Sequence, residues 1–424
     1  MPSAAPTSST RRDRVLPLDG LRTLAIALVV LYHLHVPGFG SGFVGVNVFF
    51  VLSGYLITTL LLGEHARSGR IRLGRFWVRR VLRLYPTLLA VVVVGLLLWP
   101  LVGDYQGSTM TPLGAAAVAV SYTGNLARSF FGESQGIFAP MWSLSMEEQF
   151  YLVWPPLLVL ALAFLVVRPH GRAVLMAVLG LLVVASAVAS GLLHESPGGS
   201  ATPDVYFSPV LNVAPLLLGC LLAFVMGTER GHALFSGVGG SVATWAGLAG
   251  VLGSLAVVGS GWQAEPLVFS VALPGVGVAS ALLIGGLVAR PTIVARGLSV
   301  GWVAWTGRAL SYPLYLWHVP MIALTGLWLD GPLAVVVVLA LAVLLSVLTH
   351  RWVEQPALRL KDRFEPAARR GAGDAARADA ERAAVAERAA VSERAPDAAP
   401  AAVAEPSPDA EPSQSATNRT AHHV

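Results

Sequence analysis

Long apolar segments alternate with short polar segments over most of the chain. A helix needs about 20 apolar residues to cross the hydrocarbon core of a bilayer, so segments of this length predict transmembrane helices. The apolar segments are residues 16–35, 43–62, 84–102, 112–127, 141–167, 173–193, 209–226, 241–260, 267–289, 312–328 and 332–350. The pattern predicts an all-α, polytopic membrane protein.

The positions of the arginines indicate how many of these segments cross the membrane, because short cytoplasmic loops are enriched in Lys and Arg. Arginines lie in the loops at 67–83, 168–172, 230, 290–308 and 351–363, and acidic residues lie in the loops at 195–204 and 265. Ten crossings satisfy this rule throughout, whereas eleven would put the last arginines outside. The segment 112–127 is shorter than the other apolar segments and carries several polar residues. We therefore predict about ten transmembrane helices, with 112–127 as a re-entrant or interfacial segment.

The two ends of the chain differ in composition from the apolar region between them. The first is rich in Ser, Thr, Pro and Arg, and the last in Ala, Arg, Glu and Pro, with few large apolar residues that could build a core. We predict disordered cytoplasmic tails at 1–14 and 361–424 around a transmembrane domain at 15–360. No small-x-small cleavage site follows the first apolar segment, so we interpret it as a retained signal anchor.

Composition supports the membrane class and excludes several others. Hydrophobic residues make up 55% of the 424 residues and charged residues 12%. The net charge of +5 comes almost wholly from arginine, since Lys361 is the only lysine, and we expect the bilayer rather than nucleic acid as the partner. The single cysteine, Cys220, excludes an internal disulfide and a cysteine-built metal site. With no HExxH spacing either, we predict no metal.

The first apolar segment carries ionisable residues where a simple anchor would have none. They are Asp19, Arg22, His33 and His35. Each costs about 2.5–3.5 kcal/mol in hydrocarbon, so such groups usually face a protein interior or a wet cavity. Eleven positions separate Arg22 from His33, which is about three helical turns and 16 Å with both side chains on one face. A plain alternative is an anchor whose arginine and histidines reach the two headgroup layers.

Other polar residues in or beside the apolar segments are candidates for a site. Arg80 and Arg83 lie three positions apart and could bind phosphates from one helical face, or could serve only topology and contacts with anionic lipid. Asn47 and Ser53 could line a site or simply join neighbouring helices. His318 lies between two prolines and could be catalytic or a hydrogen-bonded packing residue.

Five motifs, in order along the chain, resemble those of the membrane-bound acyltransferase 3 family. They are Leu18-Asp19-Gly20-Leu21-Arg22 ending in Tyr32-His33, residues 45–58 (GVNVFFVLSGYLIT), 79–86 (RRVLRLYP), 142–151 (WSLSMEEQFY) and 312–318 (YPLYLWH). The resemblance covers about 15–360. It implies about ten helices and transfer of an acyl group, often acetyl, from a cytoplasmic coenzyme A thioester to a hydroxyl of a carbohydrate or glycosylated metabolite.

The resemblance also implies site residues. The family has an arginine and a histidine separated by ten residues, and this pattern falls on Arg22 and His33. Its Arg-x-x-Arg motif falls on Arg80 and Arg83, and its Trp-Ser-Leu-x-x-Glu motif falls on 142–147. Two departures are visible: Thr23 stands where glycine is common, and no hydrolase-like domain follows the last apolar segment, unlike in many members. The second departure leaves the acceptor open.

The chemistry of acyl transfer fits these residues. An alcohol that attacks a thioester needs a base, and the neutral imidazole of His33 suits that role near pH 7. Glu147 or Glu148 could orient the imidazole and stabilise imidazolium, as carboxylates do in triads. A covalent acyl-histidine and direct transfer both stay open. We expect acyl-CoA, most simply acetyl-CoA, as the donor, with its phosphates bound at Arg80, Arg83 and Arg22. We expect the pocket to include Asp19, Asn47, Ser53, Trp142, Ser143 and His318.

Other function classes would use a similar set of residues. A transporter or a flippase of a lipid-linked or sugar substrate would also carry intramembrane His, Arg and Glu, but the sequence has no evident inverted repeat of the kind common in such folds. A structural scaffold would not need buried charges. We therefore expect a multi-pass acyltransferase in the cell membrane with both termini cytoplasmic.

Overall fold

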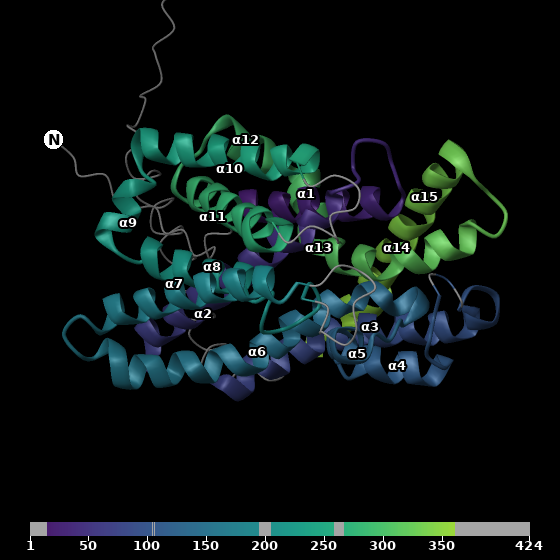
Figure 1. Cartoon of the computed structure of the whole chain (residues 1–424), viewed down its shortest axis with the longest axis horizontal. Helices are drawn as coiled ribbons and strands as arrows, with labels where there is room; N and C mark the ends of the chain where they lie inside the picture. Colours follow the sequence, from purple (N-terminus) through teal and green to yellow (C-terminus); the bar gives the residue numbers. More distant parts are fainter. Residues whose placement is uncertain (1–14, 104, 106, 195–204, 258–266, 361–424) are drawn as a thin grey trace, which may run out of the picture. The chain divides into compact units, whose positions relative to one another are not determined.

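A computed structural model of the chain describes residues 15–103, 105, 107–194, 205–257 and 267–360. The tails predicted at 1–14 and 361–424 lie outside the described residues, so their prediction is not tested. Figure 1 shows the described part of the chain, which is helical and contains no β-strand. The all-α prediction is therefore confirmed.

The helices follow one another with short connections. In chain order they are α1 (Leu16–His33), α2 (Gly45–Ser68), α3 (Leu73–Val102), α4 (Pro112–Val120), α5 (Gly124–Phe131), α6 (Trp142–Ala161), α7 (Gly171–Leu192), α8 (Ala214–Met226), α9 (Glu229–Leu234), α10 (Gly237–Val257), α11 (Leu273–Ala289), α12 (Ile293–Leu298), α13 (Gly301–Ala309), α14 (Ser311–Thr325), α15 (Gly331–Thr349) and α16 (Gln355–Leu360). Short 3₁₀ segments, η1 (Gly42–Val44) and η2 (Gly136–Met141), precede α2 and α6. Three π-helical segments, η3 (Leu162–Val166), η5 (Val268–Ala272) and η6 (His350–Glu354), extend or interrupt longer helices.

Among the described residues, eight helices are long and apolar enough to cross a bilayer. They are Leu16–His33, Gly42–Ser68, Leu73–Val102, Gly136–Val166, Gly171–Leu192, Gly237–Ala256, Val268–Ala289 and Gly331–Leu360. The other two predicted spans correspond to α8, with 13 residues, and α14, with 15 residues. Both are shorter than the about 20 residues that a spanning helix needs. Length thus supports eight crossings, and the predicted count of about ten stays a prediction.

The polar segment at 112–127 forms two short helices, α4 with 9 residues and α5 with 8. Nine helical residues rise only about 13.5 Å, which is less than half of the hydrocarbon core. Two amide side chains fix this segment to α6: the buried Asn125 donates from Nδ2 to Gln149 Oε1 (3.1 Å), and Gln149 Nε2 donates to the Tyr122 carbonyl (2.8 Å). The segment therefore does not supply a spanning helix.

We expect both ends of the α4–α5 segment to face the same side of the membrane. In a Cys220→Ser background, single cysteines at the exposed positions Leu113 and Phe131 should both react with an impermeant thiol reagent added to intact cells. Reaction of one position in intact cells and of the other only after the cells are opened would show instead that the segment crosses.

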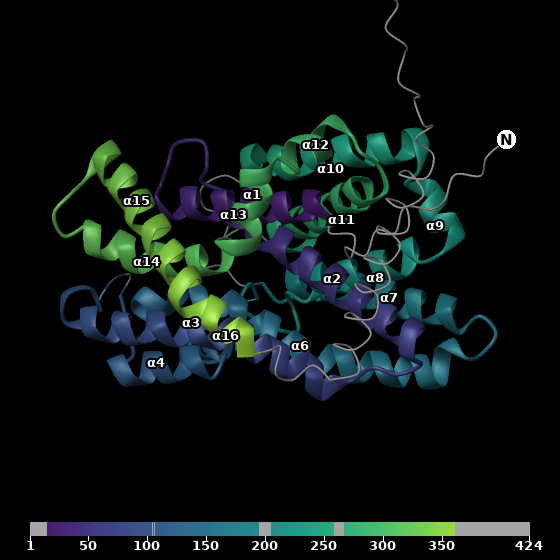
Figure 2. The same ribbon diagram turned by 180° about the vertical axis from the view of Figure 1, so that it is seen from behind.

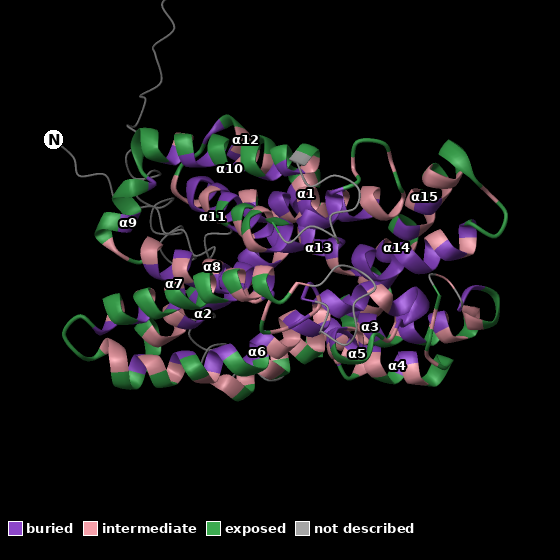
Figure 3. Cartoon of the chain, in the orientation of Figure 1, coloured by how far each residue is buried: buried purple, intermediate pink, exposed green. Residues whose placement is uncertain are grey.

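Close helix packing fills the centre of the described domain. Figure 3 shows buried residues on the facing sides of α1, α2, α8 and α14, whereas α7 and α10 present exposed residues. One close approach joins α2 to α8. A Cβ built on Gly54 would lie 2.0 Å from the Leu216 carbonyl oxygen, and one built on Gly219 would lie 2.1 Å from the Val51 carbonyl oxygen. Small residues allow such backbone contact in membrane bundles.

This contact predicts a stability effect. Gly219→Ala should lower the free energy of unfolding in detergent by about 1–3 kcal/mol, because the added methyl group overpacks the α2–α8 contact. Gly253→Ala is the matched control: it lies in α10 with no atom within 4 Å of a built Cβ, so stability should hold or rise by about 0.5–1 kcal/mol. Equal stability of the two variants would contradict the tight contact.

Candidate active site

The N-terminal half of α1 is held by α13. A Cβ on Gly307 would lie 1.8 Å from the Asp19 carbonyl oxygen, and Thr23 Oγ1 donates to the Val303 carbonyl (2.7 Å). Only a glycine fits at this approach, so the sequence of α13 fixes the position of α1. Arg22 pairs with Asp19 at 3.2 Å on the same turn. The two ionisable residues predicted near the start of α1 are therefore partners of each other.

His33 is the last residue of α1. Its Nδ1 lies 2.9 Å from the Val29 carbonyl oxygen. Since a carbonyl oxygen can only accept, Nδ1 carries a proton in this arrangement, and in the neutral imidazole the lone pair is then on Nε2. The ring lies against that of His318, with the two centroids 4.9 Å apart. The structure thus brings together two histidines that are far apart in the sequence.

His318 lies in the middle of α14 and is fully buried. Its Nδ1 lies 2.6 Å from the Tyr315 carbonyl oxygen, so Nδ1 again carries the proton. The buried Nε2 has no hydrogen-bond partner among the described residues. Buried polar atoms are almost always paired, and an unpaired one often marks a functional position. The His33–His318 pair therefore offers two neutral imidazoles with unshared lone pairs.

Tyr315 connects this pair to α6. Its hydroxyl donates to the Pro140 carbonyl (2.6 Å), and so accepts from Ser143 Oγ, 2.7 Å away. Its ring centroid lies 5.5 Å from that of His318. Trp142, the neighbour of Ser143, packs instead against Phe50 and a pair of aromatic residues, Tyr206 and Phe207. Ser143 thus belongs to the polar connection, and Trp142 belongs to an aromatic cluster beside it.

Glu147 lies one helical turn beyond Ser143 and is held by hydroxyl groups. Its Oε1 accepts from Ser53 Oγ (3.0 Å) and its Oε2 from Tyr151 (3.1 Å). Glu148 pairs with Arg80 at 3.6 Å, and the Arg80 guanidinium lies 3.7 Å from the centroid of the Tyr151 ring. Among the described residues, no hydrogen bond joins either carboxylate to His33. The orienting role predicted for Glu147 or Glu148 therefore has no direct contact to His33 in this structure and stays a prediction.

The arginines predicted to bind the donor form a cluster around α3. Arg22, Arg80 and Glu354 all lie within electrostatic range of the Arg83 side chain. Arg80 is engaged by Glu148 and Tyr151, as described above. Arg83 is half-buried, and no carboxylate lies within 4 Å of its guanidinium in the described part of the chain. A partly buried cation without a close partner favours an incoming anion.

Asn47 faces a different direction from Ser53. It lies seven residues before Gly54, so the two share one face of α2, and Gly54 contacts α8 at Leu216. The Asn47 side chain is 1% exposed, and neither of its amide atoms has a hydrogen-bond partner among the described residues. Ser53 points to Glu147, as shown above. The structure therefore places Ser53, but not Asn47, in contact with another candidate residue.

Sequence reasoning missed three residues of this arrangement. Tyr151 lies four positions after Glu147, and Tyr315 three positions before His318; helical spacing could have placed both beside known candidates. Glu354 offered no such signal, because its relation to Arg83 depends on how α3 and η6 pack together.

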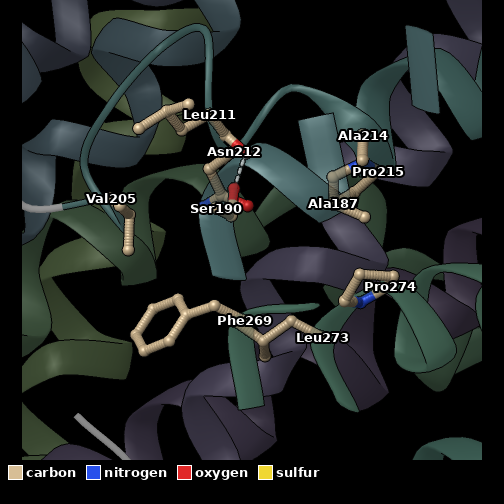
Figure 4. A pocket seen from close by; sticks show the side chains of 10 residues that line it. All are labelled: Ala187, Ser190, Val205, Leu211, Asn212, Ala214, Pro215, Phe269, Leu273 and Pro274. Atoms are coloured by element: carbon tan, nitrogen blue, oxygen red, sulfur yellow. Dashed lines mark hydrogen bonds between the residues drawn. The ribbon is translucent and has the colours of Figure 1, made fainter. Parts of the chain in front are cut away.

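A separate pocket lies between α7, the start of α8 and the η5–α11 segment (Figure 4). It is lined by Ala187, Ser190, Val205, Leu211, Asn212, Ala214, Pro215, Phe269, Leu273 and Pro274. The hydroxyl of Ser190 donates to the carbonyls of Ser186 and Leu211, and Asn212 Nδ2 donates to the Tyr206 carbonyl. These polar groups are satisfied within the protein, and none of the candidate site residues lines this pocket.

Comparison with known proteins identifies the family. Residues 16–351 match the family described as "Acyltransferase domain". The chain is 33% identical over 361 residues to YrhL of Bacillus subtilis, covering 82% of this chain and 55% of that protein. It is 32% identical over 326 residues to peptidoglycan O-acetyltransferase OatA of Listeria monocytogenes (75% and 51%) and 30% identical over 364 residues to O-acetyltransferase OatA of Staphylococcus aureus (81% and 57%).

The chain therefore spans about half the length of these curated relatives. No solved structure matches. The family match covers the segments that carry all five sequence motifs and confirms the resemblance noted from them. The chain belongs to this acyltransferase family.

Proposed function

We propose that this protein is a membrane O-acyltransferase that moves an acyl group, most simply acetyl, from cytoplasmic acyl-CoA to a hydroxyl of a carbohydrate or glycosylated metabolite. The observation that carries the proposal is the pair of histidines with free Nε2 lone pairs, joined through α1 to the arginine cluster about three turns away. Relatives named as peptidoglycan O-acetyltransferases make a peptidoglycan sugar the first acceptor to test.

In the proposed reaction, His33 acts as the general base. Its Nε2 takes the proton from the acceptor hydroxyl while the oxygen attacks the thioester carbonyl, and collapse of the tetrahedral intermediate breaks the C–S bond. The Nδ1 proton stays with the Val29 carbonyl, which holds the ring in the required tautomer. The proton taken by His33 then passes to the departing thiolate, so the step balances. His318 is the second imidazole of the site and stabilises the charged form of His33.

The carboxylates have a supporting role in this proposal. Glu147 lies one helical turn after Ser143, whose hydroxyl is hydrogen-bonded to Tyr315 beside His318. Glu148 pairs with Arg80. The two carboxylates therefore lie on the helix that runs between the histidine pair and the arginine cluster, and we propose that they support both without contacting the reacting atoms.

Coenzyme A brings phosphate charges that cannot enter hydrocarbon unpaired. We propose that these phosphates bind at Arg83, with the positive charge of Arg22 nearby, on the cytoplasmic side of the domain, and that the pantetheine arm extends along α1 toward His33. This arrangement agrees with cytoplasmic termini and a donor that approaches from inside the cell.

The test uses purified protein in liposomes with acetyl-CoA labelled in the acetyl group. Transfer of label to a glycan, with release of free coenzyme A, supports the proposal. A label on the protein that forms before acceptor is added, is removed by hydroxylamine and is absent from His33→Ala would favour an acyl-histidine over direct transfer. Movement of a glycan across the liposome membrane without any acetyl-CoA turnover would support the transporter alternative instead.

A further inference from the structure

The end of the long C-terminal helix changes its geometry beside the arginine cluster. Between α15 and α16, residues His350–Glu354 form the π-helical segment η6, which packs against α3. Figure 2 shows α16 next to α3. The Trp317 Nε1 donates to Thr349 Oγ1 (2.9 Å) and fixes this point to α14. Single π turns inside helices frequently occur at functional sites.

The π turn directs one acidic side chain inward. Glu354 is 5% exposed, whereas its neighbours Arg351 and Trp352 are exposed. A buried carboxylate is costly unless hydrogen bonds and opposite charges compensate it. The position of Glu354 therefore requires partners.

A short chain of hydrogen bonds supplies one partner. Gln355 Nε2 lies 3.0 Å from His350 Nε2, and since an amide nitrogen can only donate, the imidazole accepts at Nε2. His350 Nδ1 then carries the proton and donates to Glu354 Oε2 at 2.8 Å. In this arrangement the imidazole accepts at Nε2 and donates at Nδ1, and the Glu354 carboxylate only accepts. A buried carboxylate also needs a positive charge nearby.

The segment η6, which carries Glu354, packs against α3, which carries Arg83, and the Arg83 guanidinium lies within electrostatic range of the Glu354 carboxylate. The neighbouring arginines have carboxylates of their own, Arg22 with Asp19 at 3.2 Å and Arg80 with Glu148 at 3.6 Å. Arg83 has Glu354 nearby but not in contact. A carboxylate at this range compensates the charge of the guanidinium without occupying its hydrogen-bonding fork, which is the arrangement that a bidentate phosphate contact requires.

We propose that Glu354, oriented by His350, is a positioning residue that holds the Arg83 guanidinium ready for a phosphate group of the acyl donor. This inference rests on the donor binding of the proposed function and adds to it a residue outside the α1 and α3 motifs. Glu354 does not touch the donor. It acts through Arg83 alone.

The test compares two donors. Glu354→Gln keeps the shape of the side chain and removes its charge, so the KM for acetyl-CoA should rise about tenfold with kcat nearly unchanged, while the KM for acetyl-pantetheine, which has no phosphate, should stay the same. Glu354→Asp should recover part of the acetyl-CoA affinity. Glu229→Gln, which removes an exposed carboxylate, is the matched control and should leave both KM values unchanged.

A double-mutant cycle separates positioning from general structural support. In an Arg83→Gln background, Glu354→Gln should cause no further loss of donor affinity, because it acts through a guanidinium that is already absent. Fully additive losses, or an equal loss with acetyl-pantetheine, would overturn the inference. If the unchanged protein turns over no acyl-CoA, the proposed function itself fails, whereas normal donor affinity of Glu354→Gln in an active enzyme refutes only this inference.

Discussion

Replacing His33 by alanine is expected to abolish acyl transfer while the protein still inserts and folds. A general base contributes about 10²–10⁴-fold to the rate, and the loss would be larger if the imidazole itself carried the acyl group. The fold should tolerate the change, because His33 ends α1 and its only hydrogen bond among the described residues is local, to Val29. Turnover of acetyl-CoA with a glycan acceptor measures the effect, and size-exclusion chromatography with circular dichroism monitors folding.

His35→Ala is the matched control for this experiment. His35 is exposed, lies beyond the helix with a φ of 52°, and is close in sequence to His33. Its removal should change the rate by less than about threefold. Near-normal turnover by His33→Ala would end the assignment of the base, and His318→Ala would then be the decisive variant, since His318 presents the other free imidazole nitrogen in the pair.

Much of the fold could be predicted because it depends on local pattern. The apolar segments gave the long helices, and the polar, short segment at 112–127 indicated a non-spanning structure that appears as α4 and α5. The eleven-residue spacing of Arg22 and His33 placed both on α1. These features follow from helical periodicity and from the cost of placing polar groups in lipid, both of which can be read from one stretch of sequence.

Other features depend on contacts between distant segments. The hydrogen bond between Ser143 and Tyr315 joins residues 172 positions apart, and nothing in either segment specifies the other. The expectation that Glu147 or Glu148 would orient His33 came from the chemistry of triads, and the hydrogen bonds of Glu147 to Ser53 and Tyr151 could not be predicted from it. Side-chain pairing depends on the rotation of each helix about its axis, which the chemistry of the residues does not determine.

The arrangement of the arginines predicts unequal effects at two positions that look equivalent in the sequence. Arg80 pairs with Glu148 and the Tyr151 ring, whereas Arg83 has no carboxylate in contact within the described part of the chain. Arg83 should therefore supply the donor contact, and Arg80 should mainly neutralise buried carboxylates. The two substitutions should separate donor affinity from the integrity of the site.

Arg83→Ala is expected to raise the KM for acyl-CoA about ten- to a hundredfold, since a hydrogen bond to a charged group contributes about 1.5–3 kcal/mol. Arg83→Lys should recover only part of this loss, because an ammonium group lacks the bidentate fork.

Arg80→Ala should instead leave Glu148 without its cation and lower kcat and stability more than donor affinity. Arg70→Ala, at an exposed position between α2 and α3, is the control for a general loss of positive charge. Direct acyl-CoA binding to purified, correctly inserted variants distinguishes these effects: wild-type affinity in Arg83→Ala would mean that the arginines serve topology alone, and the phosphate-binding role would have to be abandoned.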